Sequence, residues 1–187
     1  PNTSFYNFES RSICTLDPFS PACFATQCTK NGWPMKGMQM GRGLVVRSKH
    51  VTGRIDRYVA VSEFSKKILS KYLPRNSKVD VVYNPVTATD RGPAEIVEGA
   101  PFTFVGRMQP EKDPVTLAEA AKIANVPVRF IGDGPELEKV KAANPDAEIT
   151  GWLSQAEVIE KVRTSRAIVM PSRWYETAGL AILDALS

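Results

Sequence analysis

Two acidic residues flank a glycine-containing helix start in the last part of the sequence. Glu176 directly precedes the stretch Thr177–Leu180, and Asp184 follows Glu176 by eight positions. The N-terminus of a helix offers N–H groups without partners, and glycine lets a ligand approach the main chain closely, so such a turn suits a phosphate group. We therefore predict that an anion binds the main-chain amides of Thr177, Ala178, Gly179 and Leu180.

Basic residues and further glycines follow two earlier segments that have the pattern of strands. Gly106 and Arg107 end one of these segments, with Lys112 in the loop behind them, and Gly132 follows the next segment. Arginine can hold a phosphate through two parallel hydrogen bonds, and lysine adds a second positive charge. These positions predict a cationic rim that can bind a phosphorylated ligand.

The stretch after Pro101 alternates strand and helix patterns four times, and these elements must position the rim. The apolar runs FTFVGR, VPVRFIGDG, AEITGWL and RAIVMPS are typical of buried strands. Asp113 before Pro114 predicts a capped helix start, and Ser154 with Glu157 predicts a capping box. Apolar strands joined by helices predict an α/β fold with a parallel sheet and helices on both faces. Ligands of such sheets bind beyond the carboxyl ends of the strands. The helix after Asp113 is expected to bury Leu117, Ala120, Ala121 and Ala124.

The first part of the chain is organised differently. Residues 1–49 are rich in Ser, Thr, Pro, Gly and Asn and show no sustained period, which predicts loop with short helical pieces. RYVAV and KVDVVYNPV then have the pattern of strands. Between them EFSKKILSKYL has the pattern of a helix, with Ser62 as its N-cap and Phe64, Ile68 and Leu69 on its apolar face. After a linker rich in Gly and Pro, the boundaries predict a partial domain over residues 1–95 and a second domain over residues 101–187.

Charge is distributed unevenly along the chain. The net charge of +4 combines 13 Lys/Arg against 5 Asp/Glu over residues 1–80 with 11 against 15 over residues 81–187. The basic half could face nucleic acid, an anionic membrane or a phosphorylated substrate, or it could be a solvated surface without a partner.

The cysteines and the chain ends bear on compartment and completeness. Cys14, Cys23 and Cys28 are an odd number within fifteen residues, which argues against a secreted disulfide framework and favours a reducing, cytoplasmic location. Their spacing fits no compact zinc pattern, so no metal is expected. No apolar run approaches the roughly 18 residues of a membrane span. The missing initiator Met and the ending within a helical pattern predict a fragment.

Four motifs together resemble the donor-binding domain of glycosyltransferase family 4, also called group 1. They are FVGRMQPEKD, IGDGPELEKV, GWLS and VMPSRWYETAGLAILDA, in this order. The resemblance covers residues 101–187 and implies a GT-B fold, in which a Rossmann-like donor domain follows an acceptor domain. RYVAVSEFSKKIL and KVDVVYNPV are similar, more loosely, to the end of that acceptor domain.

The resemblance also implies roles for single residues. Arg107 and Lys112 would neutralise the diphosphate of a nucleotide sugar, and Glu176 would contact the donor sugar, so these three are the expected catalytic residues. Gly106, Gly132 and the stretch Thr177–Leu180 would line the nucleotide and phosphate site. Asp184 stands where the family has a second glutamate for the ribose hydroxyls, and its shorter side chain departs from that pattern.

The function implied by the resemblance is retaining transfer of a sugar in polysaccharide or glycoconjugate biosynthesis. The donor would be a UDP- or GDP-sugar, with no further cofactor, and the acceptor a saccharide or a lipid-linked molecule. The protein would work in the cytoplasm, in peripheral contact with the cytoplasmic membrane face and without nucleic acid. The fragment alone is expected to have little transferase activity.

One alternative belongs to another class of protein. A non-catalytic binding module could hold nucleic acid or membrane with its basic first half and use the α/β half as a scaffold. Arg107 and Lys112 would then be ordinary loop charges, and Glu176 would only complement a helix dipole. A dinucleotide fingerprint is incomplete, because Leu137 replaces its third glycine, and the sequence has no P-loop motif.

Overall fold

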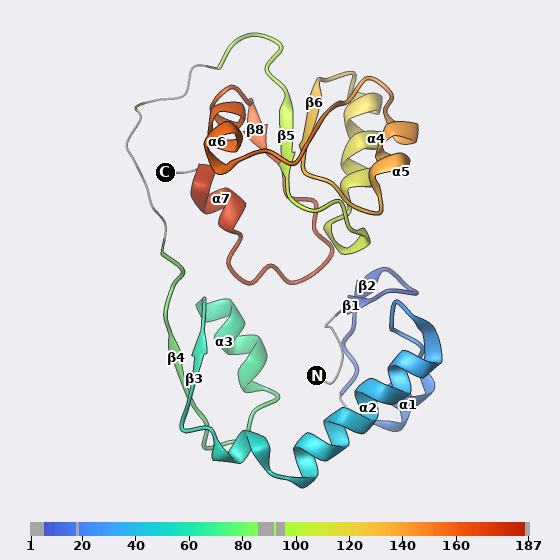
Figure 1. Cartoon of the computed structure of the whole chain (residues 1–187), viewed down its shortest axis with the longest axis vertical. Coiled ribbons are helices and arrows are strands. Elements are labelled where there is room, and N and C mark those ends of the chain that lie inside the picture. Colours follow the sequence, from blue (N-terminus) through green and yellow to red (C-terminus); the bar gives the residue numbers. More distant parts are fainter. Residues whose placement is uncertain (1–5, 18, 86–91, 93–95, 186–187) are drawn as a thin grey trace. The chain divides into compact units, whose positions relative to one another are not determined.

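The computed structural model describes residues 6–17, 19–85, 92 and 96–185 (Figure 1). By their contacts these residues form two units, one with Pro1–Pro85 and Trp174–Ala178, the other with Val86–Arg173 and Gly179–Ser187. Most of the predicted linker lies outside the described residues, so the boundaries at residues 95 and 101 stay a prediction. Along the described part of the chain, no helix is long and apolar enough to cross a membrane.

A long helix dominates the start of the first unit, where mostly loop was predicted. The elements here are β1 (Tyr6–Asn7), β2 (Ser12–Ile13), α1 (Pro21–Ala25), α2 (Gly32–Ser48) and the 3-10 turn η1 (Val51–Arg54). The prediction of loop was wrong for α2, which contains four glycines that disfavour a helix. Its buried residues Lys36 and Met40 lie one turn apart on one side, so tertiary contacts stabilise what local propensity does not.

A parallel strand pair with a helix between its strands completes the first unit. Strand β3 (Arg57–Ala60) pairs with β4 (Lys78–Val81), and α3 (Glu63–Ser70) connects them. The predicted N-cap is confirmed, because the Ser62 hydroxyl accepts a hydrogen bond from the Ser65 amide at 3.0 Å. The predicted apolar face is buried only in part: Ile68 is half-buried, whereas Phe64 and Leu69 are 43% and 37% exposed and Ser65 is buried.

The second unit carries the predicted parallel sheet. Its elements are β5 (Phe102–Val105), η2 (Pro110–Lys112), α4 (Pro114–Ala124), β6 (Val128–Ile131), α5 (Leu137–Ala143), β7 (Glu148–Gly151), α6 (Gln155–Arg163), β8 (Ala167–Ile168) and α7 (Leu180–Ala185). The four strands run parallel in the order β7-β6-β5-β8. This order is that of a Rossmann-like half, so the predicted fold class is confirmed.

Helices cover the two faces of this sheet. On one face Phe104 and Phe130 pack with Leu117 and Ala118 of α4 and with Val140 of α5, and Figure 1 shows these two helices side by side. Side chains of successive strand residues point to opposite faces of a sheet, so Val105 lies on the other face from Phe104. On that face it lines a cavity with residues of α6 and with Ala181 of α7.

The buried stripe of α4 differs from the prediction in one register. Pro114, Leu117, Ala118 and Ala121 are buried, with spacings of three, four and seven residues from the first, whereas Ala120 and Ala124 are exposed. Positions 118, 120 and 121 are all alanine, so the sequence does not distinguish a buried face that contains Ala118 from one that contains Ala120. Packing against the sheet buries Ala118. The predicted capping box of α6 is confirmed, with Ser154 and Glu157 bonded reciprocally.

Candidate functional site

The carboxyl ends of β5 and β6 continue to pair beyond the sheet. The Gly106 amide donates to the Ile131 carbonyl at 2.9 Å, and the Met108 amide donates to the Asp133 carbonyl at 2.8 Å. The Glu136 amide then donates to the Met108 carbonyl at 3.0 Å. Hydrogen bonds between main chains therefore hold the two loops together and form the rim, which we define as residues 106–112 and 132–136.

Glycines make this close approach of the loops geometrically feasible. Gly132 has φ 128°, and a Cβ there would overlap the Gly106 carbonyl oxygen. Gly134 has φ 155°, and its Cβ would lie 2.5 Å from the Met108 carbonyl oxygen. Both glycines thus make room for the neighbouring loop. Gly106, also at positive φ, would place a Cβ only against the ring of Phe104 at 3.8 Å.

Two cations stand on the rim. Arg107 is exposed, and within the described parts of the chain its guanidinium makes no hydrogen bond or ion pair. It is followed by Met108, which is fully buried and anchors the loop in the core. Lys112, half-buried, ends η2 five residues later. The structure therefore places the two predicted cations in one loop, with a fixed main chain beneath Arg107.

Arg173 fastens the loop after β8 to the same rim, a contact that the sequence analysis missed. Its amide donates to the Glu111 carbonyl at 3.0 Å. Its guanidinium donates to the carboxylate of Asp113 and, at 3.3 Å, to the hydroxyl of Thr116. The predicted helix start is confirmed in position, because Asp113 is the N-cap and Pro114 begins α4. The Asp113 carboxylate makes no capping hydrogen bond, since it binds Arg173 and the backbone of Asp113 is left-handed at φ 50°. The two residues are 60 positions apart, so no local sequence pattern indicates this ion pair.

The residues after Arg173 belong by their contacts to the first unit. The Thr177 carbonyl accepts hydrogen bonds from the Ser62 hydroxyl at 2.7 Å and the Ser65 hydroxyl at 3.3 Å, at the start of α3. The Tyr175 ring meets the Phe64 ring edge to face with centroids 5.3 Å apart. The half-buried Glu176 lies within this segment.

The predicted site residues are thus divided between the two units. Gly106, Arg107, Lys112, Gly132, Gly179, Leu180 and Asp184 fall in the second unit, and Glu176, Thr177 and Ala178 in the first. That these residues act on one ligand stays a prediction.

The predicted helix start after Glu176 forms as expected. Gly179 adopts φ 58°, and its carbonyl accepts from the amides of Ile182 at 2.8 Å and Leu183 at 3.2 Å. Helix α7 then begins at Leu180. Asp184 lies within this helix, and its side chain is outside the described part of the structure.

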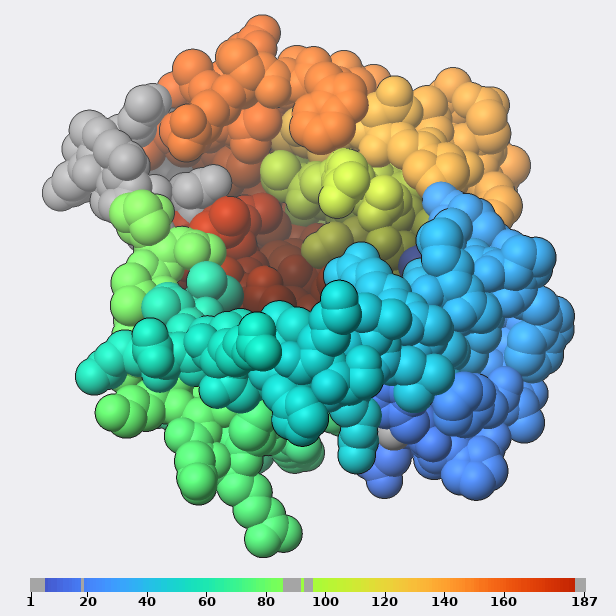
Figure 2. Space-filling view, turned by 60° about the horizontal axis from the view of Figure 1, so that its bottom comes forward, coloured from blue at the N-terminus to red at the C-terminus, as the bar shows by residue number. Residues whose placement is uncertain are grey.

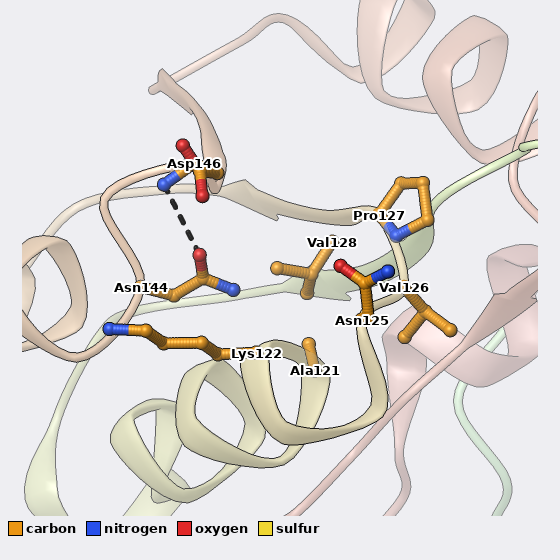
Figure 3. A pocket seen from close by; sticks show the side chains of 8 residues that line it. All are labelled: Ala121, Lys122, Asn125, Val126, Pro127, Val128, Asn144 and Asp146. Atoms are coloured by element: carbon orange, nitrogen blue, oxygen red, sulfur yellow. Dashed lines mark hydrogen bonds between the residues drawn. The ribbon is translucent and has the colours of Figure 1, made fainter.

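Two cavities of the second unit differ in their relation to the rim. One of about 180 Å³ lies against Val105 and Gly106 and is walled by apolar side chains of α6 (Val158, Ile159 and Val162) and by Ala181. The other, of about 300 Å³, is lined by Lys122, Asn125, Val128 and Asn144 among others (Figure 3). It lies where β6 begins, at the end of the strand away from the rim. Ligands of parallel sheets bind at the carboxyl end, so the first cavity is the better candidate.

Metal ligands do not gather in the described residues. No group of three or more His, Cys, Asp or Glu side chains could hold an ion there. What the rim offers is positive charge and main-chain groups beside an apolar cavity, a combination that suits a phosphorylated ligand with a less polar part.

A Rossmann-like sheet with a glycine-lined cationic rim at its carboxyl edge places the chain in the class of Rossmann-like α/β domains. Comparison with known proteins narrows this class. The family model of glycosyl transferases group 1 matches residues 87–187, more than half of the chain, and the chain belongs to this family. No curated protein sequence matches the chain.

Solved glycosyltransferase structures of the GT-B type share the fold. TarM superposes with a TM-score of 0.59 and 17% identity, over 74% of this chain and 30% of TarM. A mutant of S. aureus TarM in complex with fondaparinux, alpha-GlcNAc-glycerol and UDP gives 0.57 and 18% over the same shares. Sucrose-phosphate synthase from Thermosynechococcus elongatus gives 0.55 and 17%, over 87% of this chain and 44% of the synthase. The chain thus spans less than half the length of these structures.

Proposed function

We propose that the chain serves a retaining glycosyltransferase of family 4, which moves a sugar from a nucleoside diphosphate to a saccharide or lipid-linked acceptor. The observation that carries the proposal is the rim, where a fully buried Met108 and two glycine-dependent loop contacts fix the main chain under an exposed Arg107. Membership of the glycosyl transferases group 1 family supports the transfer of a sugar.

Transfer of a sugar from a nucleoside diphosphate leaves a diphosphate that gains negative charge as the glycosidic bond breaks. Arg107 and Lys112 would stabilise that charge more in the transition state than in the bound donor, which is how electrostatic catalysis lowers a barrier. Because the main chain under Arg107 is fixed, little reorganisation is needed when the charge develops. Gly106 leaves room for the ligand to approach the backbone, and the cavity beside it would take a less polar part of the donor.

The roles of the remaining residues rest on the resemblance to family 4. Glu176 would contact the donor sugar, Thr177–Leu180 would bind phosphate through main-chain amides, and Asp184 would bind the ribose. The formation of α7 directly after Gly179 supports the phosphate role, since helix starts present free amides. UDP and GDP are both candidates for the nucleotide, and the complex of the S. aureus TarM mutant contains UDP.

Binding of the donor can be tested by thermal stability. A ligand that binds only the folded protein stabilises it, by about 2.7 kcal/mol at a concentration of 100 Kd. We expect UDP, GDP or one of their sugars to raise the melting temperature of the wild type. Arg107→Ala should weaken this binding roughly 10- to 100-fold, because a hydrogen bond to a charged group contributes about 1.5–3 kcal/mol.

Arg166→Ala is the matched control. Arg166 is an exposed arginine of the same unit directly before β8, and therefore at the opposite edge of the sheet from the rim. It should bind nucleotide like the wild type. If both variants respond alike to every nucleotide and nucleotide sugar, the rim is not the donor site.

We also propose that the first unit contacts an anionic membrane, where a lipid-linked acceptor would be found. Residues 18–55 contain six Lys/Arg and no Asp or Glu. Five of these cations are exposed (Lys30, Arg42, Arg47, Lys49 and Arg54), and so are Trp33, Met38 and Val45 of α2. Figure 2 shows this stretch, in light blue to cyan, at the surface. Exposed apolar side chains among basic ones are typical of proteins that bind the bilayer interface.

Sedimentation with vesicles tests this contact, and a nucleic-acid binding assay tests the alternative function. We expect binding to phosphatidylcholine vesicles that contain phosphatidylglycerol and little binding to phosphatidylcholine alone. Met38→Ser should weaken binding to these vesicles, because it removes apolar surface that would be buried in the bilayer interface. Affinity for nucleic acid that falls steeply with salt, without any response to nucleotides, would instead favour the non-catalytic binding module.

A further inference from the structure

A lysine side chain is buried between two cysteines in the first unit. Lys36 is 2% exposed, Cys28 is 2% exposed and Cys23 is 7% exposed. The Lys36 Nζ donates to the Thr26 carbonyl at 2.8 Å and to Cys28 Sγ at 3.2 Å, and Cys23 Sγ lies 4.0 Å away. Within the described residues no carboxylate forms an ion pair with Lys36. This is an uncommon setting, because buried lysines are usually paired with an acid.

Local structure holds these atoms in place. Helix α1 is capped by Ser20, whose hydroxyl accepts from the Cys23 amide at 3.1 Å, and it ends at Ala25 with Thr26 as its C-cap. Lys36 projects from the inner side of α2. An ammonium group has three N–H donors, and three acceptors surround this one: the Thr26 carbonyl and the sulfurs of Cys23 and Cys28. These contacts restrict the nitrogen to the position beside the sulfurs. The Lys36 Nζ is therefore kept at hydrogen-bond distance from Cys28 Sγ.

We propose that Cys28 and Lys36 form an oxidative cross-linking site, in which a peroxide joins the sulfur to the nitrogen. In the first step hydrogen peroxide transfers one oxygen to the Cys28 thiol, giving a sulfenic acid and one water. In the second step the Lys36 ammonium first gives one proton to solvent, and the lone pair of the neutral nitrogen attacks the sulfur. An S–N bond forms, the S–O bond breaks, and the hydroxide leaves as water with a second proton from nitrogen. Sulfur is oxidised by two electrons and peroxide is reduced by two.

The geometry favours Lys36 over the other partners of a sulfenic acid at Cys28. The nitrogen is already in direct contact with Cys28 Sγ at 3.2 Å. Burial of both groups keeps bulky thiols of the cell away from the intermediate. The link is reversible, since two equivalents of a small thiol restore the cysteine and the amine and leave as a disulfide. It would tie the segment after α1 covalently to α2.

Mass spectrometry of the wild-type chain provides the test. The reduced protein is treated with stoichiometric hydrogen peroxide, alkylated and digested with trypsin. Trypsin cuts after Arg11, Lys30 and Arg42, and a modified Lys36 resists cleavage. The cross-link would therefore join peptide 12–30 to peptide 31–42, with the loss of two hydrogens. Of the three thiols per chain, two should remain.

The competing products give different results. A disulfide between Cys23 and Cys28 would stay within peptide 12–30 and leave one thiol of the three, and it would overturn the proposal. A chain that keeps all thiols, or that gains two oxygens at Cys28 without joining peptides, would overturn it as well. Treatment of the linked protein with dithiothreitol should restore the third thiol and the cut after Lys36.

Variants separate the amine from the second thiol. Cys23→Ser should still form the link, as should Cys14→Ser, the control at a thiol outside the cluster. Lys36→Met should form none while keeping the helical signal of the reduced protein in circular dichroism. Where Lys36→Met fails to fold, peptide mapping of Cys23→Ser still decides: absence of the linked peptides there refutes the proposal.

Discussion

Replacement of Gly134 by alanine tests whether the two loops of the rim depend on a missing side chain. The new Cβ would lie 2.5, 2.8 and 2.9 Å from three main-chain atoms of Met108, where ordinary contacts begin at about 3.4 Å. The backbone at φ 155° also disfavours a side chain. The loops must therefore move apart by roughly 1 Å, which breaks the hydrogen bonds from Met108 to Asp133 and from Glu136 to Met108.

The expected magnitude follows from these contacts. Two main-chain hydrogen bonds contribute about 1 kcal/mol each, and the strained backbone costs about 1–3 kcal/mol more. The sum is a loss of about 3–5 kcal/mol in the unfolding free energy of the second unit. For a unit of this size about 1 kcal/mol corresponds to 4–8 °C, so the melting temperature should fall by roughly 12–40 °C.

The assay is a melt followed by circular dichroism, with amide hydrogen exchange of β5 and β6 to report on the second unit alone. Gly41→Ala is the matched control with the opposite sign. Gly41 lies inside α2, and its Cβ would meet nothing within 4 Å. This variant should gain about 0.5–1 kcal/mol, because alanine favours the helix. A Gly134→Ala protein within 1 kcal/mol of the wild type would refute the account of the rim.

Two further predictions concern acidic residues of the second unit. Burial raises the pKa of Glu148, but hydrogen bonds from Lys161 at 2.9 Å and Arg129 at 2.7 Å lower it by a larger amount. The pKa of Glu148 is therefore below its ordinary value of 4.5. Glu148 therefore stabilises the fold above that value, and the stability is lost as pH falls through the depressed pKa. Glu148→Gln should cost about 1 kcal/mol at pH 7, since the 42% exposed side chain is partly screened, and should flatten the acid limb of a pH-dependent melt. Wild type and variant that lose stability in parallel below pH 5 would contradict this. Hydrogen bonds from the side chain and backbone of Ser154 lower the pKa of Glu157, so Ser154→Ala should raise that pKa in an NMR titration. An unchanged titration would mean that the capping box does not persist in solution.

The fold of the second unit could be predicted because its signals are local and agree with one another. Apolar strands, Pro114 in a first turn and the Ser154–Glu157 box each mark an element boundary, and the parallel order follows from their alternation. Helix α2 could not be predicted, since its glycines oppose it and Lys36 and Met40 stabilise it only through tertiary contacts.

The sequence predicts where the candidate site lies along the chain, but it does not predict the contacts that hold its loops together. That Gly106 and Arg107 follow a strand end could be inferred from the apolar run before them. Gly132 was expected to line a ligand site, and its contact with the Gly106 carbonyl shows that it makes room for a loop. The pairing of Arg173 with Asp113 joins residues 60 positions apart, and no local pattern specifies such a contact.

The hydrogen bonds between the loops after β5 and β6 join main-chain atoms. The backbone shape of the rim therefore does not depend on the side chain that a rim residue presents to a ligand. Side chains at positions 107 and 133 take no part in the hydrogen bonds that join the loops, which run through the amide of Gly106 and the carbonyl of Asp133. Position 107 can therefore vary in sequence while the backbone keeps its course, whereas the Asp133 carboxylate accepts from the Gly134 amide at 2.6 Å and supports its own loop. A library randomised at position 107 would change the chemistry of the rim on an unchanged scaffold, whereas positions 132 and 134 would tolerate glycine alone.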